Sequence, residues 1–251
     1  MRITSCGITD VGMKRTNNED AYLINDELNL FVVCDGMGGH VGGEMASSIA
    51  VNTVEEVLSS VEAEPPAATP EDATEVTREK LRYAVRLAGK RIYEKASAEP
   101  EYKGMGTTVL VLLVEGGNAY VAHVGDSRAY LVRADTIEQL TEDHSLVNEK
   151  IRAGVLTAEE AKHHKLRNII TRSLGYQEEV DVDIQIRGVR RNDVFLLCTD
   201  GLSNLVDPAE MGETLRTLSP QTAVRRLVDL ACTRGGEDNI TTLVTRIEEV
   251  P

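Results

Sequence analysis

The chain has 251 residues, of which 41% are hydrophobic and 27% charged, and its formal net charge is -14. This is ordinary globular composition, long enough for one large domain or two small ones. The acidic balance argues against a nucleic-acid-binding surface, which would carry a basic stripe.

The predicted strands and helices occur in groups along the chain. Two apolar runs, 21–25 and 30–34, flank a short polar stretch and predict a hairpin. An apolar stripe of helical period predicts a helix from Glu44, and Thr69 followed by Pro70 marks the start of a second helix. Further strands are expected at 107–115, 119–126, 127–135, 180–188, 193–201 and 239–249, and further helices at 208–218 and 220–235. This grouping favours an α+β fold.

A polar segment at 142–173 interrupts these elements. It mixes acids and bases with few large apolar residues, which is typical of low local stability. His144, His163 and His164 lie in or beside it and are interpreted as surface or hinge groups, whereas His123, within a strand, is interpreted as structural.

Several features predict a cytoplasmic protein without membrane association. The N-terminus lacks the apolar stretch of a signal peptide, and the longest apolar run, 109–114, is far shorter than the roughly 20 residues needed to cross a bilayer. No C-x-x-C pair is present, and Cys34 and Cys198 lie at the ends of apolar strands. We therefore expect reduced cysteines packed in the core.

Aspartates recur where apolar strands end. A single such aspartate usually forms a turn or caps a helix. If the strand ends converge, however, several carboxylates meet in one small volume and need cations to offset their repulsion. An all-oxygen cluster suits Mg²⁺ or Mn²⁺ better than zinc. The acidic residues concerned are Asp35, Asp126, Asp200, Asp238 and the pair Glu19-Asp20.

A glycine-rich stretch follows Asp35 and contains His40. Its spacing is close to the nucleotide-binding pattern G-x-G-x-x-G, but Val41 stands where the last glycine is required. No G-x-x-x-x-G-K-[ST] occurs in the chain either. A nucleotide-binding loop is therefore disfavoured.

The motifs resemble a known family when they are taken together. In chain order they are RTNNEDA, VVCDGMGGHVGGEMAS, MGTTV, AHVGDSRAYL, LTEDHSLV, ITRSLG, LLCTDGL and GGEDNITTLV. This order is similar to that of the metal-dependent protein phosphatases of the protein phosphatase 2C type, and most similar to the bacterial stand-alone enzymes. The resemblance covers essentially the whole chain.

The resemblance implies a fold and an activity. The fold is α+β, with two antiparallel β-sheets packed as a sandwich and helices on both outer faces. The chain would be a single catalytic domain, 1–251, with a flap subdomain at about 145–173. The activity is hydrolysis of phosphoserine and phosphothreonine in proteins, by direct attack of a hydroxide that bridges two Mg²⁺ or Mn²⁺ ions.

The resemblance also implies the metal ligands. Asp35 and the carbonyl of Gly36 would hold both ions. Asp20 would bind chiefly through water, with Glu19 supporting it. Asp200 and Asp238 would complete one site, and Asp126 would hold a weaker third ion.

The resemblance also implies roles at the substrate phosphate for two further residues. Arg15 resembles the family's phosphate clamp, because a guanidinium can bind two phosphate oxygens at once. His40 either donates a proton to the leaving group or fills a glycine-rich turn. In animal relatives the comparable histidine directly follows the Asp-Gly pair, whereas Met37 stands there in this chain.

The expected partners are phosphoproteins, including a cognate Ser/Thr kinase and its substrates, and the chain is expected to be a monomer. Three alternative functions compete with this one: a phosphatase dedicated to one anti-sigma-factor antagonist, a catalytically inactive scaffold, and a Mg²⁺-dependent nuclease. The first would call for a sensor or partner-binding module, for which the chain has no room. The second would fit a loss of metal ligands, and the third a basic surface; neither feature is present.

Overall fold

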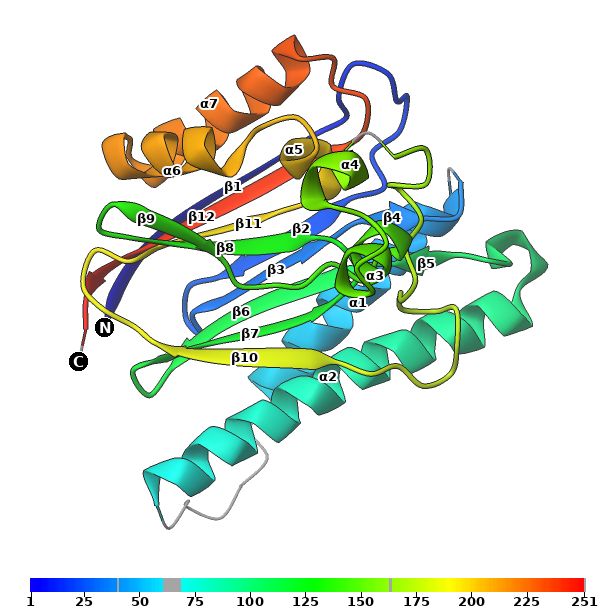
Figure 1. Cartoon of the computed structure of the whole chain (residues 1–251). Helices are drawn as coiled ribbons and strands as arrows, with labels where there is room; N and C mark the ends of the chain where they lie inside the picture. The colour runs from blue at the N-terminus through cyan, green and yellow to red at the C-terminus, as the bar shows by residue number, and fades with distance from the viewer. Residues whose placement is uncertain (40, 61–68, 163, 251) are drawn as a thin grey trace.

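The computed structural model describes residues 1–39, 41–60, 69–162 and 164–250. Figure 1 shows two antiparallel sheets that lie face to face between layers of helices. The first sheet has the strand order β1 (Arg2–Asp10), β12 (Ile240–Glu249), β11 (Val194–Cys198), β8 (Arg128–Arg133), β9 (Thr136–Gln139). The second has the order β10 (Asp183–Gly188), β7 (Asn118–Val124), β6 (Val109–Glu115), β3 (Leu30–Cys34), β2 (Ala21–Asn25).

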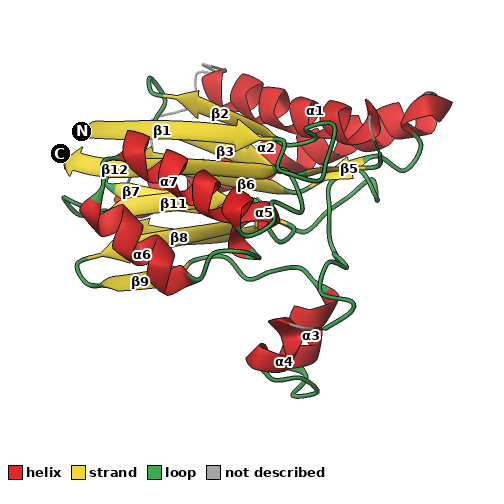
Figure 2. Ribbon diagram, turned by 90° about the horizontal axis from the view of Figure 1, so that it is seen from above, coloured by secondary structure: helices red, strands yellow, loops and turns green. Residues whose placement is uncertain are grey.

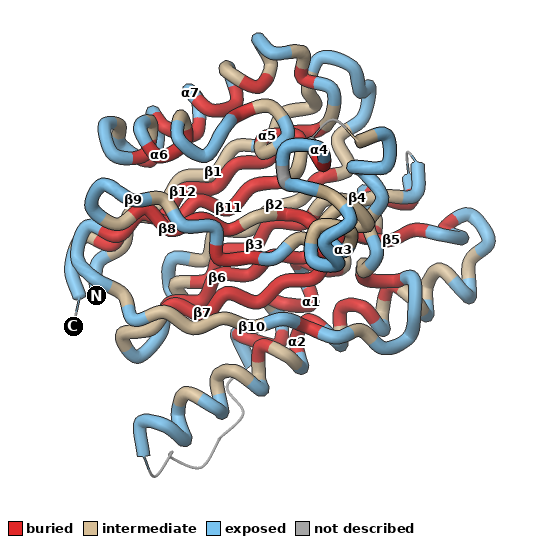
Figure 3. Tube along the Cα trace, viewed as in Figure 1, coloured by how far each residue is buried: buried red, intermediate tan, exposed pale blue. Residues whose placement is uncertain are grey.

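Side chains of the central strands alternate between two cores. In β3, Leu30 and Val32 pack under the helices, whereas Phe31 and Val33 pack between the two sheets. This alternation follows from the period of two in a strand. Both faces of β3 are therefore apolar, and Figure 3 shows the inner strands buried along most of their length.

Helices cover both outer faces of the sandwich. The helices α1 (Val41–Ser59) and α2 (Pro70–Ala98) pack on the second sheet. The first sheet is covered by α5 (Asp200–Ser203), α6 (Pro208–Thr217) and α7 (Pro220–Thr233). The predicted α+β sandwich with helices on both faces is confirmed.

Two elements differ from the sequence-based prediction. The first helix begins at Val41, three residues before Glu44, because the glycines at its start pack closely against Glu19 and Met105. The strand β1 was not predicted, since its serine, threonine and glycine residues give no clear apolar alternation. It forms by pairing with β12 along its whole length.

Several short elements lie outside the two large sheets. The short strands β4 (Gly36–Met37) and β5 (Gly106–Thr107) pair with each other, and a 3-10 turn η1 spans Pro100–Tyr102. The helices α3 (Leu146–Arg152) and α4 (Ala158–Lys162) belong to the predicted flap, and Figure 2 shows them set apart from the sandwich. No helix within the described residues is both long and apolar enough to span a membrane.

Candidate metal centre

Strand ends from both sheets meet at one end of the sandwich. Cys34 at the end of β3 pairs with Ala21 at the start of β2, and Cys198 at the end of β11 pairs with Thr242 near the start of β12. Because these neighbours are antiparallel, the residue that follows one strand lies beside the residue that precedes the next. Asp20 and Asp35 meet in one sheet and Asp200 and Asp238 in the other, and Asp126, after β7, lies near them.

Asp35 lies among the other carboxylates. Its desolvated setting raises its pKa well above the ordinary value of 3.8, and the negative charges of its four aspartate neighbours raise it further. Burial, and then the charge of Asp238, raise the pKa of Asp200 as well. Ionising all of these carboxyl groups together is therefore unfavourable unless cations offset their charges.

Asp20 is buried and has one satisfied and one unsatisfied oxygen. Its Oδ2 accepts hydrogen bonds from the hydroxyls of Thr199 at 3.0 Å and Thr241 at 2.6 Å. Its Oδ1 is buried and has no hydrogen-bond partner among the described residues. Burial raises the pKa of Asp20 to about 7, although the two hydroxyls act in the opposite direction. The unsatisfied oxygen is a position that a cation or its water would fill.

Asp126 repeats this pattern on the other side of the cluster. It follows β7 directly after Gly125, and its Oδ1 is also buried without a partner in the described part of the chain. Burial raises the pKa of Asp126 to about 8, and the charge of Asp200 adds to this effect. Buried oxygens without donors are costly in a folded protein. Such oxygens in an all-oxygen set fit a hard divalent ion such as Mg²⁺ or Mn²⁺.

Gly36 and Glu19 form a tightly packed corner beside Asp35. A Cβ on Gly36 would lie 2.3 Å from the carbonyl oxygens of Glu19 and Gly43, so no side chain fits there. A Cβ on Gly43 would lie 1.9 Å from Oε2 of Glu19. The Glu19 carboxylate therefore lies against the first turn of α1, next to the backbone of Gly36.

Arg15 reaches the cluster from an exposed loop. Its Nη2 donates to Oδ2 of Asp238 at 2.8 Å, while the side chain remains about half exposed. Asn239 anchors this loop: its Nδ2 donates to the carbonyls of Val11 and Asn17, and its Oδ1 accepts from the amide of Glu19. The guanidinium is thus placed next to the carboxylates with one face open to solvent.

Backbone bonds position Asp35 itself. Its amide donates to Oγ1 of Thr108, its carbonyl accepts from the amide of Thr108, and both distances are 2.9 Å. Thr108 also shares a hydrogen bond with Ser127, the residue after Asp126. Thr108 therefore links the chain segments that carry two of the aspartates.

The structure brings together most of the predicted site residues. Glu19, Arg15, Gly36 and the five aspartates all lie at this end of the sandwich, whereas His40 lies outside the residues that the structure describes. Sequence reasoning missed four supporting residues: Thr108, Thr199, Thr241 and Asn239. The only signal for them was their position beside the aspartates in MGTTV, CTDG and EDNITT.

A hollow of about 620 Å³ lies beside the cluster. Asp126 and Asp200 line it together with Asn148 and Ile151 of α3. The predicted flap therefore borders the same space as the aspartates. A substrate segment next to the cluster would contact both.

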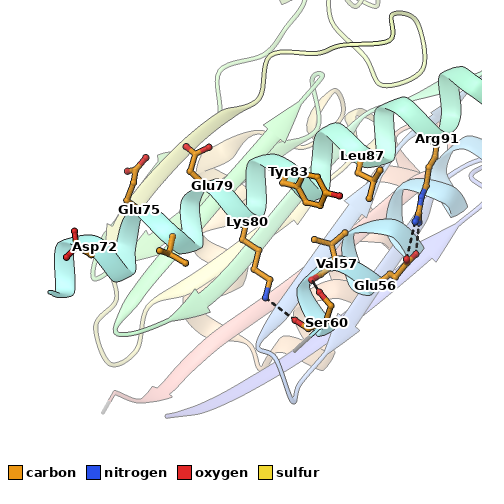
Figure 4. Close-up of a pocket in the computed structure, with 11 residues that line it drawn as sticks. Glu56, Val57, Ser60, Asp72, Glu75, Glu79, Lys80, Tyr83, Leu87 and Arg91 are labelled. Carbon is orange, nitrogen blue, oxygen red and sulfur yellow. Dashed lines mark hydrogen bonds and ion pairs between the residues drawn. The ribbon is translucent and has the colours of Figure 1, made fainter. Parts of the chain in front are cut away.

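A second, larger groove of about 830 Å³ lies between α1 and α2 and is shown in Figure 4. Arg91 pairs with Glu56, and Lys80 donates to the carbonyl of Ser60 across this groove. Glu56 follows the start of α1 at Val41 by about 22 Å along the helix axis. The groove is therefore remote from the carboxylate cluster.

His123, His144 and Asp183 form another group whose potential ligand atoms lie within 4.8 Å of one another. The two imidazole rings are stacked, with 4.8 Å between centroids and 14° between planes. An ion binds an imidazole in the plane of the ring, and two stacked planes do not converge on one ion. This group is therefore a weaker metal site than the carboxylate cluster. Both histidines are buried, so of the two interpretations of His144 the surface one is wrong, and the hinge one stays a prediction.

The fold and this site define a class of protein, and comparisons with known proteins identify the family. The family profile described as protein phosphatase 2C matches residues 13–231. The chain therefore belongs to the protein phosphatase 2C family of metal-dependent phosphoprotein phosphatases. This confirms the family and the enzyme class predicted from the sequence motifs.

Individual relatives cover nearly the whole chain. The serine/threonine phosphatase stp of Listeria innocua is 39% identical over 242 residues, which is 94% of this chain and 92% of the relative. The structure of the serine/threonine phosphatase Stp1 from Staphylococcus aureus superposes with a TM-score of 0.88 at 35% identity, covering 99% of this chain and 96% of that one.

A third similar structure contains metal ions. It is the catalytic domain of the serine/threonine protein phosphatase PstP in complex with two manganese ions. Its TM-score is 0.84 at 32% identity, and the match covers 98% of this chain and 99% of that one.

Proposed function

We propose that this chain hydrolyses phosphoserine and phosphothreonine in proteins and requires two Mg²⁺ or Mn²⁺ ions for this reaction. The observation that carries the proposal is the cluster of five aspartates with unsatisfied buried oxygens on Asp20 and Asp126. The names of the similar proteins and the manganese ions in one of them support the same activity.

The proposed ligand set follows the geometry of the cluster. Asp35 has the other four aspartates as neighbours and would serve both ions, together with the carbonyl of Gly36. Asp200 and Asp238 would complete one ion. Asp20 would reach the ions chiefly through water, because hydroxyls already hold one of its oxygens.

Two acidic residues extend this set. Asp126 lies next to Asp200 in the hollow under α3 and is proposed to hold a third, weaker ion. Glu19 would support the water around Asp20, since its carboxylate lies beside Gly36 and Gly43.

The residues around the ions perform the remaining steps. Bound ions of this kind lower the pKa of a coordinated water to near neutrality and offset charge on the phosphoryl group. Arg15 can turn from Asp238 towards a phosphate and bind two of its oxygens through the planar guanidinium. This contact would orient phosphorus for direct attack by water. In a direct attack, the phosphoryl group passes to water and is not transferred to a side chain.

We further propose that the chain acts as a cytoplasmic monomer on the substrates of Ser/Thr kinases. The described cysteines are all free thiols, which is typical of a reducing compartment. A catalytically inactive scaffold is the competing function. It is disfavoured because Asp20 and Asp126 each bury a carboxyl oxygen without a hydrogen-bond partner in the described chain, which is costly unless an ion binds there.

The decisive experiment is hydrolysis of a phosphothreonine peptide in Mn²⁺ by the wild type and Asp35→Asn. We expect the variant and the chelator-treated wild type to lose activity by at least about a thousandfold, because both remove the ions from their central ligand. Asp10→Asn is the matched control: Asp10 also ends a strand, but its Oδ1 accepts from the amide of Gly12. Wild-type activity that survives chelation would contradict the proposal.

A further inference from the structure

Every polar atom of His144 has a hydrogen-bond partner. Its backbone amide donates to the carbonyl of Gly125 at 3.0 Å, and its carbonyl accepts from the amide of Thr171 at 2.8 Å. Its ring Nδ1 accepts from the amide of Gly125 at 3.0 Å, and its Nε2 lies 3.1 Å from Oδ2 of Asp183. Because Nδ1 accepts a hydrogen bond, the proton of the neutral ring is on Nε2 and is donated to Asp183.

Asp183 on β10 holds the two ends of segment 145–171, which makes up most of the predicted flap at about 145–173. Its Oδ2 accepts from His144, just before the segment, and its Oδ1 accepts from Nη1 of Arg172 at 3.1 Å, just after it. The bridge between Ser145 and Ile170 closes the same neck. Segment 145–171 is therefore a closed loop whose two ends are fixed on one carboxylate.

The same histidine also holds the turn before Asp126. Gly125 exchanges two hydrogen bonds with His144, one through its amide and one through its carbonyl. Gly125 has φ +113, and a Cβ there would lie 2.5 Å from Cγ2 of Thr108. The turn is thus held between His144 on one side and Thr108, the partner of the Asp35 backbone, on the other.

We propose that Asp183 and His144 are positioning residues that couple the segment 145–171 to the Asp126 carboxylate. A displacement of the segment's neck moves His144, and His144 moves Gly125 and Asp126 with it. The inference rests on the proposed function only for its activity readout, because the coupling itself is a property of the chain.

Two substitutions of His144 separate the two connections. In His144→Asn, the side-chain oxygen takes the place of Nδ1 and can still accept from Gly125, but the side chain no longer reaches Asp183. In His144→Gln, the longer amide can donate to Asp183 but no longer offers the acceptor to Gly125. Both side chains are neutral and polar, so they are matched in charge.

Amide hydrogen exchange by NMR on the metal-free full chain is the direct measurement. We expect exchange at Gly125 to accelerate roughly fivefold in His144→Gln but to stay near wild type in His144→Asn, as for the loss of one hydrogen bond. Exchange at Thr171 should accelerate in His144→Asn and in Asp183→Ala. Arg187→Gln is the control. Arg187 also lies on β10, but its exposed ion pair is with Glu138 of β9 and involves neither His144 nor Asp183.

The activity readout is the Mn²⁺ concentration that gives half-maximal hydrolysis. Half-maximal hydrolysis of a phosphothreonine peptide should require several-fold more Mn²⁺ in His144→Gln than in His144→Asn. If Asp183→Ala does not fold, the His144 pair carries the test alone. Equal exchange at Gly125 in the two His144 variants would overturn the proposal. The predicted exchange pattern in a protein without phosphatase activity would support the coupling and refute the proposed function.

Discussion

At the scale of single residues, the carboxylate of Asp20 combines two opposed requirements. Thr199 and Thr241 donate to one oxygen, which fixes the direction of the carboxylate and favours its charged form. Burial acts against that charged form and dominates, so the pKa rises to about 7. The hydroxyls therefore prepare Asp20 for a cation without making it stably charged in the absence of one.

Removing one hydroxyl should weaken metal binding. Thr241→Val is nearly isosteric and deletes the 2.6 Å bond to Asp20. A hydrogen bond to a charged group contributes about 1.5–3 kcal/mol, so we expect half-maximal activity to need at least about ten times more Mn²⁺. The measurement is a Mn²⁺ titration of peptide hydrolysis at constant pH.

Thr242→Val is the matched control for this titration. Thr242 is the next residue of β12, and its buried hydroxyl lacks a hydrogen-bond partner within the described residues. Its replacement should leave the Mn²⁺ requirement unchanged and stability equal or higher. Identical titrations for the two variants would show that Thr241 does not support Asp20.

Sequence could predict the aspartates but not their donors. Asp35 and Asp200 stand out because an apolar strand stops at a charged residue followed by glycine. Thr241 looks like any polar residue of a strand, since alternation reveals only which face it occupies. Its role depends on the approach of Asp20 from 221 positions away in the chain. Such a contact becomes visible only in the folded structure.

At the scale of elements, the site depends on how the start of β12 is tied to the N-terminal loop. Asn239 lies just before β12 and is almost fully buried. It binds the backbone of Val11, Asn17 and Glu19 with three hydrogen bonds of 2.8–3.0 Å. A single amide thus positions the loop that carries Arg15.

Asn239→Ala should therefore impair both stability and catalysis. Leaving two backbone carbonyls and one backbone amide without these partners should lower the free energy of unfolding by about 2–4 kcal/mol. The kcat/KM for a phosphothreonine peptide should fall as well, because Arg15 loses its fixed position. Urea denaturation and steady-state kinetics measure the two effects.

Asn52→Ala is the comparison for this variant. Asn52 is exposed on α1, and its side chain makes one 3.3 Å bond to Ser48. Its loss should change stability by less than about 0.5 kcal/mol. If Asn239→Ala were as mild, the loop would be held by its other contacts.

Helices and strands could be predicted from the sequence where neighbouring residues alone show the pattern of burial. The hairpin at 21–25 and 30–34 was predicted with correct bounds because its second strand is a continuous apolar run between polar turns. The start of α1 was missed because Gly42 and Gly43 have poor helix propensity. At these positions tertiary packing determines the residue type, since a side chain at Gly43 would collide with Glu19.

At the scale of the whole molecule, five of the aspartates that contribute to the formal net charge of -14 lie at one end of the sandwich. In the absence of ions, burial keeps the pKa of Asp20 at about 7 and that of Asp126 at about 8. The ordinary value of both is 3.8. Folding of the metal-free protein is therefore linked to protons, whereas folding of the metal-bound protein is linked to cations.

The sign of this linkage gives a prediction. Since both pKa values are higher in the folded state, the stability they contribute is complete below pH 3.8 and is lost as the pH rises through 7 and 8. The metal-free protein should lose stability between about pH 4 and pH 8 and change little above that range. Divalent ions compete with protons for the same oxygens, so the rise in Tm on adding Mn²⁺ should be larger at pH 8 than at pH 6.

Thermal unfolding with chelator and with Mn²⁺ at both pH values measures this difference. Asp35→Asn should largely abolish the Mn²⁺-induced rise at both pH values, because the amide cannot serve as the shared anionic ligand. Asp10→Asn should keep the full rise, since its side chain is already bonded to Gly12. A rise in Tm that is equal at pH 6 and pH 8 would show that protons do not occupy the cluster in the metal-free protein.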